Sequence, residues 1–132
     1  MSKGKILVVD DEDLVCVFFQ KVLRESGYEV AITTSGREAI KLAKQDAFDI
    51  VFTDLVMATE QVSGVEVCRS IKAISPKTVV VLVSGHPQQI LKYQMAFLAA
   101  GGRDEILRKP VSEEEILAAS EKIMSKSAEK TT

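Results

Sequence analysis

Carboxylates stand at the ends of two apolar runs in this chain, where charged groups are unexpected. Asp54 lies in the almost wholly apolar stretch 48–57, and Asp10 and Asp11 directly follow the apolar stretch 5–9. A carboxylate at the end of a buried strand is costly unless it has a partner or a task. Neighbouring carboxylates also raise one another's pKa unless a cation neutralises them. These residues therefore predict a cation site.

Two further polar residues could act together with these acids on phosphate. Ser84 and Lys109 each directly follow another apolar run. Asp54 would be the nucleophile toward a phosphoryl donor and would form an acyl phosphate. Phosphoryl transfer asks a protein mainly for positioning and charge neutralisation, which a metal ion and the Lys109 ammonium group could supply. The Ser84 hydroxyl would donate a hydrogen bond to a phosphoryl oxygen.

The acidic turn after the first apolar run favours magnesium. Mg²⁺ prefers one or two carboxylates, several waters and a phosphate oxygen to a cage made only of protein ligands. The turn at 10–13 (Asp-Asp-Glu-Asp) offers such a short acidic set. It lacks the spaced ligands and the terminal bidentate glutamate of a calcium-binding EF-hand loop. We therefore expect Mg²⁺ as the cofactor.

Each of these features also has a purely structural interpretation when it is taken alone. Asp10 and Asp11 could cap a helix. Ser84 could belong to an ordinary turn with the glycine that follows it. Lys109 could lie in a loop, because the residue before a proline leaves helical space. Only their joint occurrence at the ends of successive apolar runs favours the phosphate and metal site.

Five apolar runs of strand length must position these residues. Three of them are rich in Val, Ile and Leu with little polar alternation, which is typical of strands buried on both faces. In an open parallel sheet the ligand site lies beyond the carboxyl ends of the strands. The polar residues above all fall at that end. The expected strands are 5–9, 29–33, 49–53, 78–83 and 105–108.

Apolar residues at helical spacing fill the intervals between these strands. Tyr93 and Phe97 fall off the stripe of the fourth helix, and two interpretations stay open for them: a patch for a partner or ordinary partial burial. The stripes expected to face the core are Leu14, Phe18 and Val22; Ala39, Ile40 and Ala43; Val67, Ile71 and Ile74; Leu91, Met95 and Leu98; and Ile116, Leu117 and Ile123.

Helix starts and stops agree with this pattern. The capping-box sequence Ser-x-x-Glu occurs at 35–38, 63–66 and 112–115. Pro87 suits the first turn of the fourth helix, and Gly27 suits the residue just past the first. Strict alternation of strand and helix implies right-handed crossovers and helices on both faces of a parallel sheet. The predicted fold class is α/β, a doubly wound five-stranded parallel sheet with five helices.

Length and composition favour one folded domain. The chain has 132 residues, of which 46% are hydrophobic and 27% charged, as in ordinary globular proteins. We expect residues 1–125 to form the domain and the small, polar residues 126–132 to be a flexible tail. Cys16 and Cys68 lack the close Cys/His spacing of a zinc site, so we expect buried or half-buried thiols.

Charge and hydropathy argue against two kinds of partner. The formal net charge is -2, and the lysines and arginines are scattered rather than striped, so direct nucleic-acid binding is not expected. No apolar stretch approaches the roughly 18 residues that a membrane span requires. A cytoplasmic location is the expectation.

The chain resembles a known protein family. Residues 5–124 are similar to a receiver domain of two-component response regulators, in particular to the single-domain chemotaxis regulator. The resemblance implies a flavodoxin-like three-layer sandwich with strand order 2-1-3-4-5. It is carried by the strand-helix order, by the stretch at 102–105 and by Asp10, Asp11, Asp54, Ser84, Lys109 and Pro110.

The resemblance implies phosphoryl transfer to Asp54 from a sensor histidine kinase or a histidine phosphotransfer protein. It implies that Mg²⁺ is held by Asp11, Asp54 and the backbone carbonyl of Val56, with Asp10 assisting through water. The chain would be a signalling phosphoacceptor rather than an enzyme.

The resemblance also implies a switch. Ser84 and Lys109 would engage the bound phosphoryl group and shift a pre-existing equilibrium. The active state would present a protein-binding surface made of the fourth helix, the last strand and the last helix, to which a downstream protein target would bind.

Several positions depart from the family pattern. Ala58 stands where the family usually has proline, and Gly64 comes two residues late, so we expect a longer loop at 58–63. Ile106 replaces the usual Tyr or Phe, so we expect signalling through backbone shifts. Val56 and His86 occupy positions that commonly set the rate of phosphoryl loss. Val56 cannot orient an attacking water, which predicts slow self-dephosphorylation, whereas His86 could orient one or could simply lead into the fourth helix.

Three other classes remain as alternatives. A phosphatase or phosphotransferase of the haloacid type would need a second acid two residues after Asp54, where Val56 stands. A flavodoxin-like cofactor module would need a phosphate loop rich in Ser, Thr and Gly where the acidic turn lies. The third is a degenerate receiver that acts as a phosphorylation-independent protein-binding module; intact Asp54 and Lys109 argue against it.

Overall fold

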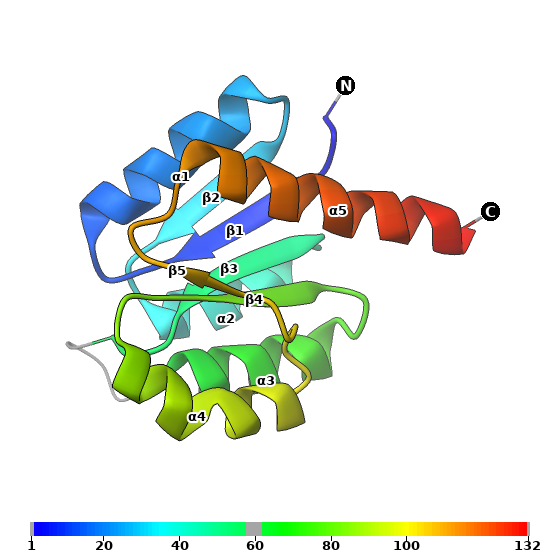
Figure 1. Cartoon of the computed structure of the whole chain (residues 1–132). Coiled ribbons are helices and arrows are strands. Elements are labelled where there is room, and N and C mark those ends of the chain that lie inside the picture. Colours follow the sequence, from blue (N-terminus) through cyan, green and yellow to red (C-terminus); the bar gives the residue numbers. More distant parts are fainter. Residues whose placement is uncertain (1, 58–61, 132) are drawn as a thin grey trace.

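The computed structural model describes residues 2–57 and 62–131 and contains one five-stranded sheet (Figure 1). The strand order is β2-β1-β3-β4-β5, and every pairing is parallel, as predicted. Each predicted strand is present, with ends that differ by at most one residue. The strands are β1 (Lys5–Val9), β2 (Glu29–Thr33), β3 (Ile50–Asp54), β4 (Val79–Ser84) and β5 (Ile106–Arg108).

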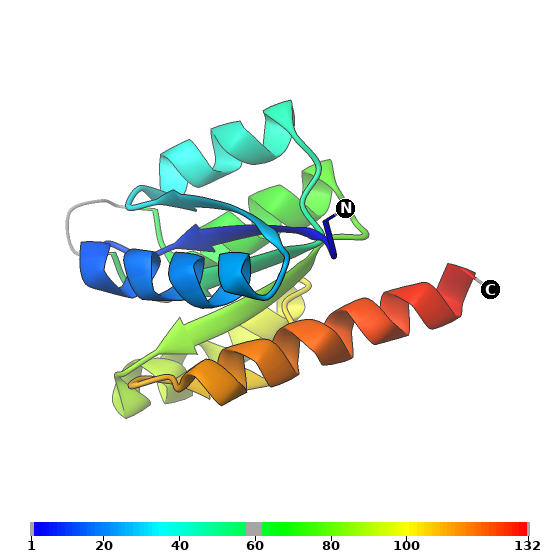
Figure 2. The same cartoon turned by 90° about the horizontal axis from the view of Figure 1, so that it is seen from above.

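Helices cover both faces of the sheet and complete the predicted three-layer sandwich. Helices α1 and α5 lie on one face, and α2, α3 and α4 lie on the other (Figures 1 and 2). No helix in the described ranges combines the length and apolarity needed to cross a lipid bilayer. The helices are α1 (Asp13–Glu25), α2 (Gly36–Gln45), α3 (Gly64–Ile74), α4 (Pro87–Ala99) and α5 (Glu113–Thr131).

The alternation of side chains along each strand divides the core into two clusters. On β1, Ile6 and Val8 face α1 and α5, whereas Leu7 and Val9 face α2, α3 and α4. All four are at most 2% exposed, so this strand is buried on both faces. Such a strand must be apolar along its whole length, and this explains the unbroken runs in the sequence.

The predicted helix signals are confirmed. The hydroxyls of Ser35 and Ser63 accept hydrogen bonds from backbone amides three residues later, at 3.1 and 3.3 Å. Ser112 and Glu115 form a complete capping box, with hydrogen bonds of 3.1 Å in both directions. Pro87 opens α4. Gly27 has a φ of +98°, the left-handed conformation that favours glycine after a helix.

The predicted core stripe of α4 is wrong. Leu91 and Met95 are each 77% exposed and Leu98 is 38% exposed, whereas Phe97 is only 1% exposed. The helix carries apolar residues on more than one side, and periodicity alone cannot choose between them. The structure has room for Phe97 on the buried side of the helix. A Cβ at Gly102 would come within 2.1 Å of the Phe97 ring, so the missing side chain makes room for that ring.

Three smaller differences from the prediction concern α1, α3 and α5. On α1, Val22 is buried as predicted, but Leu14 is 84% and Phe18 41% exposed, because Cys16 and Phe19 take the inward positions. Ile74, the last residue of α3, is 38% exposed. The backbone of α5 continues as a helix to Thr131, so most of the expected tail at 126–132 is helical; its flexibility stays a prediction. Ala58 and the loop after it, up to residue 61, lie outside the described residues.

Candidate functional site

Strand register brings the predicted site residues to one edge of the sheet. Val9 of β1 pairs with Thr53 of β3, so the residues that follow them, Asp10 and Asp54, come side by side. Asp54 in turn pairs with Val83, one residue before Ser84. Ser84 pairs with Arg108, and Lys109 is the next residue. The carboxyl ends of all these strands therefore converge, as the sequence predicted.

Lys109 joins the acids at the centre of this edge. Its Nζ lies 2.8 Å from Asp10 Oδ2, 3.4 Å from Glu12 Oε1 and 3.7 Å from Asp54 Oδ2. Asp10 and Asp54 are only 1% and 5% exposed, so they have little access to water. Buried charges need a partner or they destabilise the fold. The Lys109 ammonium group is thus the local counter-ion of two buried carboxylates.

The site disfavours the ionised form of its two buried carboxylates. Burial and, to a smaller extent, repulsion by Asp10 together raise the pKa of Asp54 to about 6, against the opposing effect of Lys109. Burial also raises the pKa of Asp10, again against the effect of Lys109. Burial alone would lower the pKa of Lys109, but the attraction of Asp10, Asp54 and Glu12 outweighs it and the pKa is raised. One ammonium group does not fully neutralise this cluster, which therefore suits an additional cation.

The backbone around Asp54 is fixed by the start of α3. Leu55 N donates a hydrogen bond of 2.9 Å to Asp54 Oδ1, and Gly64 N donates one of 2.8 Å to Leu55 O. A Cβ at Gly64 would come within 2.2 Å of the Asp54 carbonyl oxygen. Glycine is needed here because the backbones approach so closely. Although Gly64 comes two residues later than in the family pattern, it still closes the chain onto the end of β3.

The remaining predicted positions surround this centre. The Ser84 hydroxyl is buried and accepts a hydrogen bond of 3.3 Å from His86 N. The side chain of Val56 is 41% exposed, just beyond the strand. His86 is exposed and precedes the first residue of α4. Cys16 and Cys68 are buried free thiols, as predicted, and burial raises the pKa of each to about 11.

Three neighbouring acids could hold a metal ion. Asp10, Asp11 and Glu12 each offer a carboxylate oxygen, and these atoms lie within 4.8 Å of one another. Asp10 Oδ2 is buried and accepts no hydrogen bond among the described residues, although it forms an ion pair of 2.8 Å with Lys109 Nζ. A hard oxygen donor with spare lone pairs fits the chemistry of Mg²⁺.

Glu12 is the functional candidate that sequence reasoning missed. The acidic turn was visible, but its third member had no assigned role. The structure places its carboxylate both in the acidic cluster and against Lys109. The signal in the sequence was only its position two residues after Asp10. Glu12 and Lys109 are 97 residues apart in the sequence, so their pairing could not be predicted from local patterns.

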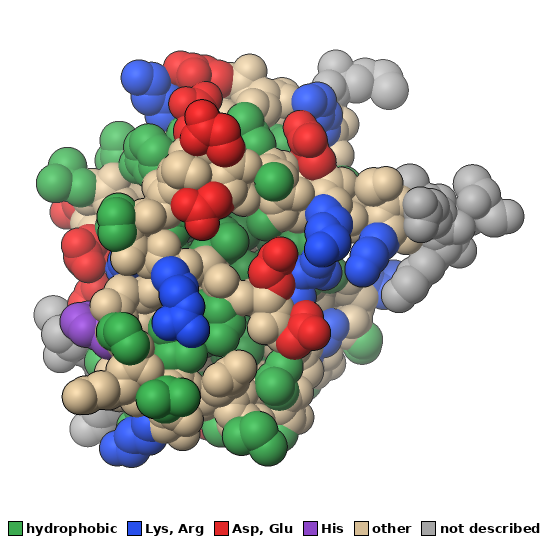
Figure 3. Space-filling model, in the orientation of Figure 1, with side chains coloured by type: hydrophobic (Ala, Val, Ile, Leu, Met, Phe, Trp, Pro, Cys, Tyr) green, Lys and Arg blue, Asp and Glu red, His purple; other side chains and the backbone are tan. Residues whose placement is uncertain are grey.

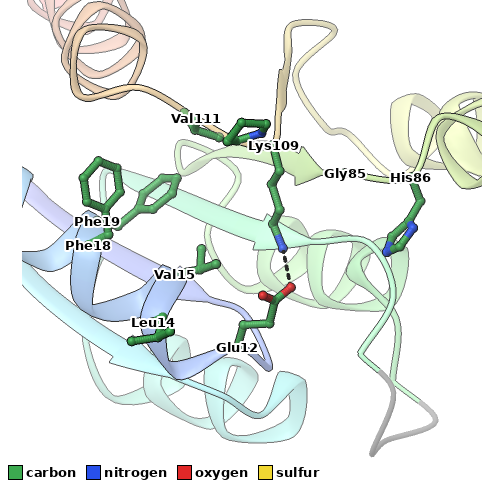
Figure 4. A pocket seen from close by; sticks show the side chains of 10 residues that line it. Glu12, Leu14, Val15, Phe18, Phe19, Gly85, His86, Lys109 and Val111 are labelled. Atoms are coloured by element: carbon green, nitrogen blue, oxygen red, sulfur yellow. Dashed lines mark hydrogen bonds and ion pairs between the residues drawn. The ribbon is translucent and has the colours of Figure 1, made fainter.

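A surface groove leads from the site along α1. Its volume is about 510 Å³, and Figure 4 shows Lys109 reaching down one end of it toward Glu12. Apolar side chains of α1 line the rest, including the exposed Leu14 and Phe18. His86 lies on the opposite side, at the start of α4 (Figure 4). The groove therefore joins a charged end to an apolar wall.

Known proteins match this chain over nearly its whole length. A model of the response regulator receiver domain matches residues 6–121. The transcriptional regulatory protein ZraR of Escherichia coli (strain K12) is 32% identical over 119 residues, which are 90% of this chain and 26% of ZraR. The chain thus spans about a quarter of the length of that relative.

Solved structures agree. A response regulator receiver domain protein from Clostridium thermocellum is 29% identical with a TM-score of 0.83, covering 95% of this chain and 97% of that one. The chemotaxis protein CheY4 of Vibrio cholerae is 25% identical with a TM-score of 0.79, covering 91% and 98%. The chain belongs to the response regulator receiver domain family, the signalling modules of two-component systems.

Proposed function

We propose that Asp54 accepts a phosphoryl group from a phosphorylated histidine of a sensor histidine kinase or a histidine phosphotransfer protein. The observation that carries the proposal is that a buried carboxylate, which neighbouring acids repel, lies beside a cation: Asp54 Oδ2 is 3.7 Å from Lys109 Nζ. This ammonium group could neutralise the charge that a phosphoryl group would add. Perturbed pKa values of this kind cluster at functional sites.

The chemistry is a transfer between two nucleophiles. An Asp54 carboxylate oxygen attacks the phosphorus, the phosphorus–oxygen bond forms and the phosphorus–nitrogen bond of the donor histidine breaks. The imidazole leaves with the bonding electrons and takes up a proton. The product is an acyl phosphate on Asp54. The protein contributes position and charge: Leu55 N fixes Asp54 Oδ1 at 2.9 Å, and Lys109 meets the charge on the transferred group.

The acidic edge fits Mg²⁺ as the resident cofactor. Asp10, Asp11 and Asp54, with the backbone carbonyl of Val56, would hold it, and Glu12 is a further candidate. When bound, the ion would neutralise negative charge on the phosphoryl oxygens and on the acids themselves. Support comes from the excess of carboxylates over cations and from the unsatisfied oxygen of Asp10.

The groove along α1 supports a protein donor. Leu14 and Phe18 lie exposed on its wall, and Lys109 stands at its end. A helix that carries the phosphorylated histidine could bury these apolar side chains while its imidazole reaches Asp54. A small donor would gain nothing from them. The exposed apolar wall therefore favours a macromolecular partner next to the phosphoacceptor.

The surface that binds a downstream protein target would be formed by α4, β5 and α5. Ser84 and Lys109 lie on the strand ends that lead into α4 and α5, so their engagement by a phosphoryl group would move both connections. Leu91, Met95 and Leu98 form an exposed apolar stripe on α4, and Figure 3 shows hydrophobic side chains gathered over this part of the molecule. Such a stripe suits a protein target. Ile106 offers no aromatic ring for the switch, so backbone movement would carry it.

The lifetime of the acyl phosphate would be long. Val56 is exposed beside Asp54 but has no group that can orient water. Replacing it in Val56→Asn should speed the loss of the phosphoryl group several-fold, measured as the decay of phosphorylated protein after the donor is removed. An unchanged decay rate would contradict this role for Val56.

One experiment separates the phosphoacceptor from a degenerate receiver. The protein is incubated with a small acyl-phosphate donor and Mg²⁺, and intact mass spectrometry counts the added phosphoryl groups. We expect one in the parent and none in Asp54→Asn. No adduct in the parent, even with a histidine phosphotransfer protein as donor, would favour a phosphorylation-independent binding module.

A further inference from the structure

Three carboxylates among the described residues lie near Lys109, and they differ strongly in their exposure to water. Asp10 and Asp54 have side chains that are 2% and 7% exposed, whereas the Glu12 side chain is 65% exposed. The contact to Asp10 is close, at 2.8 Å, and that to Glu12 is longer, at 3.4 Å. Glu12 is therefore the partner that Lys109 can lose at the least cost, since its carboxylate can return to water.

The backbone of Glu12 is fixed while its side chain is free to turn. Glu12 N donates a hydrogen bond of 2.9 Å to Asp10 Oδ1. Glu12 O accepts from Val15 N at 3.1 Å and from Cys16 N at 3.3 Å, at the start of α1. The carboxylate extends from this anchored backbone toward Lys109 at the mouth of the groove (Figure 4). Because the Glu12 side chain is 65% exposed, it has room to turn into water and release Lys109 without moving this backbone.

An ammonium group has three N–H donors and no more. When a phosphoryl group arrives on Asp54, its oxygens compete for Lys109 Nζ with Glu12, which accepts a hydrogen bond of 3.4 Å from it, and with Asp10 and Asp54, which form ion pairs with it. The contact with Asp10 is buried and the shorter of the two, so the contact with the exposed Glu12 is the one that gives way at the least cost. The contact between Glu12 and Lys109 then exists only before phosphorylation, and it stabilises only that state.

We propose that Glu12 is a positioning residue that holds Lys109 in the unphosphorylated domain and competes with the phosphoryl group for it. This inference rests on the proposed function of Asp54 and deepens it. Its consequence is directional: weakening the Glu12 contact raises the affinity of the site for a phosphoryl-like anion. Because an exposed ion pair contributes little, the expected gain is about two- to fivefold.

The test measures binding of beryllofluoride, a phosphoryl mimic, by ¹⁹F NMR at saturating Mg²⁺. Glu12→Gln should bind it about two- to fivefold more tightly than the parent. Glu12→Asp keeps the charge but shortens the reach, so it should also bind more tightly. The matched control is Asp13→Asn, which removes one neighbouring charge; Asp13 faces a different pocket, with Cys16 and Thr33.

A double-mutant cycle separates a contact with Lys109 from a general structural effect. In the Lys109→Gln background, Glu12→Gln should no longer change the affinity for beryllofluoride. The inference is overturned if Glu12→Gln binds no more tightly than Asp13→Asn, or more weakly than the parent, as a metal ligand would. A parent protein that binds no beryllofluoride would overturn the proposed function itself and the inference with it.

Discussion

Charged side chains are usually exposed and apolar side chains are usually buried. The carboxyl edge of the sheet breaks the first rule, and the outer face of α4 breaks the second. At the sheet edge, Asp10 and Asp54 are charged and nearly buried, at 1% and 5% exposure. On α4, Leu91 and Met95 are apolar and 77% exposed. The first region loses stability through desolvation and repulsion, and the second gains none from its apolar groups.

Residues in these two regions differ from core residues, because they do not stabilise the fold. Both regions break local rules without an evident structural benefit, which is expected where function constrains the sequence. Under the proposed function, the acidic edge would concentrate charge for phosphoryl transfer, and α4 would keep apolar surface available for a protein partner. Substitutions should therefore destabilise the protein in the folded core, stabilise it at the acidic edge and change its stability little on the outer face of α4.

The largest expected effect tests which side of α4 belongs to the core. Phe97→Ala should lower the free energy of unfolding by about 3–5 kcal/mol, because Phe97 is 1% exposed and the cavity cannot close easily. Met95→Ala on the same helix is the matched control and should cost less than about 0.5 kcal/mol. Urea unfolding measures both. Equal losses would mean that the exposed stripe is also structural.

The second prediction concerns the cost of the buried charge. Asp54→Asn should raise the free energy of unfolding of the metal-free protein at pH 7.5 by about 1–3 kcal/mol, because the pKa of Asp54 is raised to about 6. In the unfolded chain the pKa is about 4, so the folded state binds more protons between pH 4 and 6. Stability due to Asp54 therefore falls as pH rises through this window.

The same measurement across pH supplies its own control. The stability difference between the parent and Asp54→Asn should nearly vanish at or below about pH 4, where Asp54 is protonated in both states. Urea unfolding at several pH values measures it. A destabilised Asp54→Asn at pH 7.5 would show that the carboxylate is needed for folding, and the contrast with α4 would fail.

The third prediction is that Mg²⁺ relieves the repulsion. At a concentration ten times its dissociation constant, Mg²⁺ should raise the free energy of unfolding by about 1.4 kcal/mol, since a ligand that binds only the folded state stabilises it by mass action. Thermal unfolding with and without Mg²⁺ measures the gain. Asp11→Asn should reduce it, whereas Glu114→Gln, which removes an exposed charge on α5, should leave it unchanged. A gain of equal size in all three proteins would indicate nonspecific binding.

The smallest expected effect on stability lies on α4. Replacing both Leu91 and Met95 by serine should change the free energy of unfolding by less than about 1 kcal/mol, because both are 77% exposed. Phosphorylation of Asp54 by a small acyl-phosphate donor should remain intact in this variant. Binding of the downstream target, once identified, should be lost. If the variant still bound the target, the target-binding surface would have to lie outside this part of α4.

The sequence allowed the sheet and the site to be predicted because both follow from strong, local patterns. Buried parallel strands must be apolar throughout, so their runs and their polar ends were visible in 5–9 and 49–53. Parallel register then brings the ends together, which is why Asp10, Asp54 and Lys109 could be assigned to one edge.

Two features could not be predicted, for physical reasons. Leu91 and Phe97 are both apolar, and Phe97 is the one that turns inward, where the missing side chain of Gly102 leaves room for its ring. The pairing of Glu12 with Lys109 depends on the meeting of two loops far apart in the sequence. Side-chain periodicity carries no information about either choice, because each depends on tertiary contacts.

The most direct test of the central claim identifies the carboxylate that carries the phosphoryl group. The protein is phosphorylated with a small acyl-phosphate donor and Mg²⁺ and then treated with borohydride, which reduces an aspartyl phosphate to homoserine. Peptide mass spectrometry locates the product. We predict homoserine at position 54 alone. Homoserine at position 10 or 11, or at no position despite a phosphorylated intact mass, would contradict the assignment of Asp54 as the phosphoacceptor.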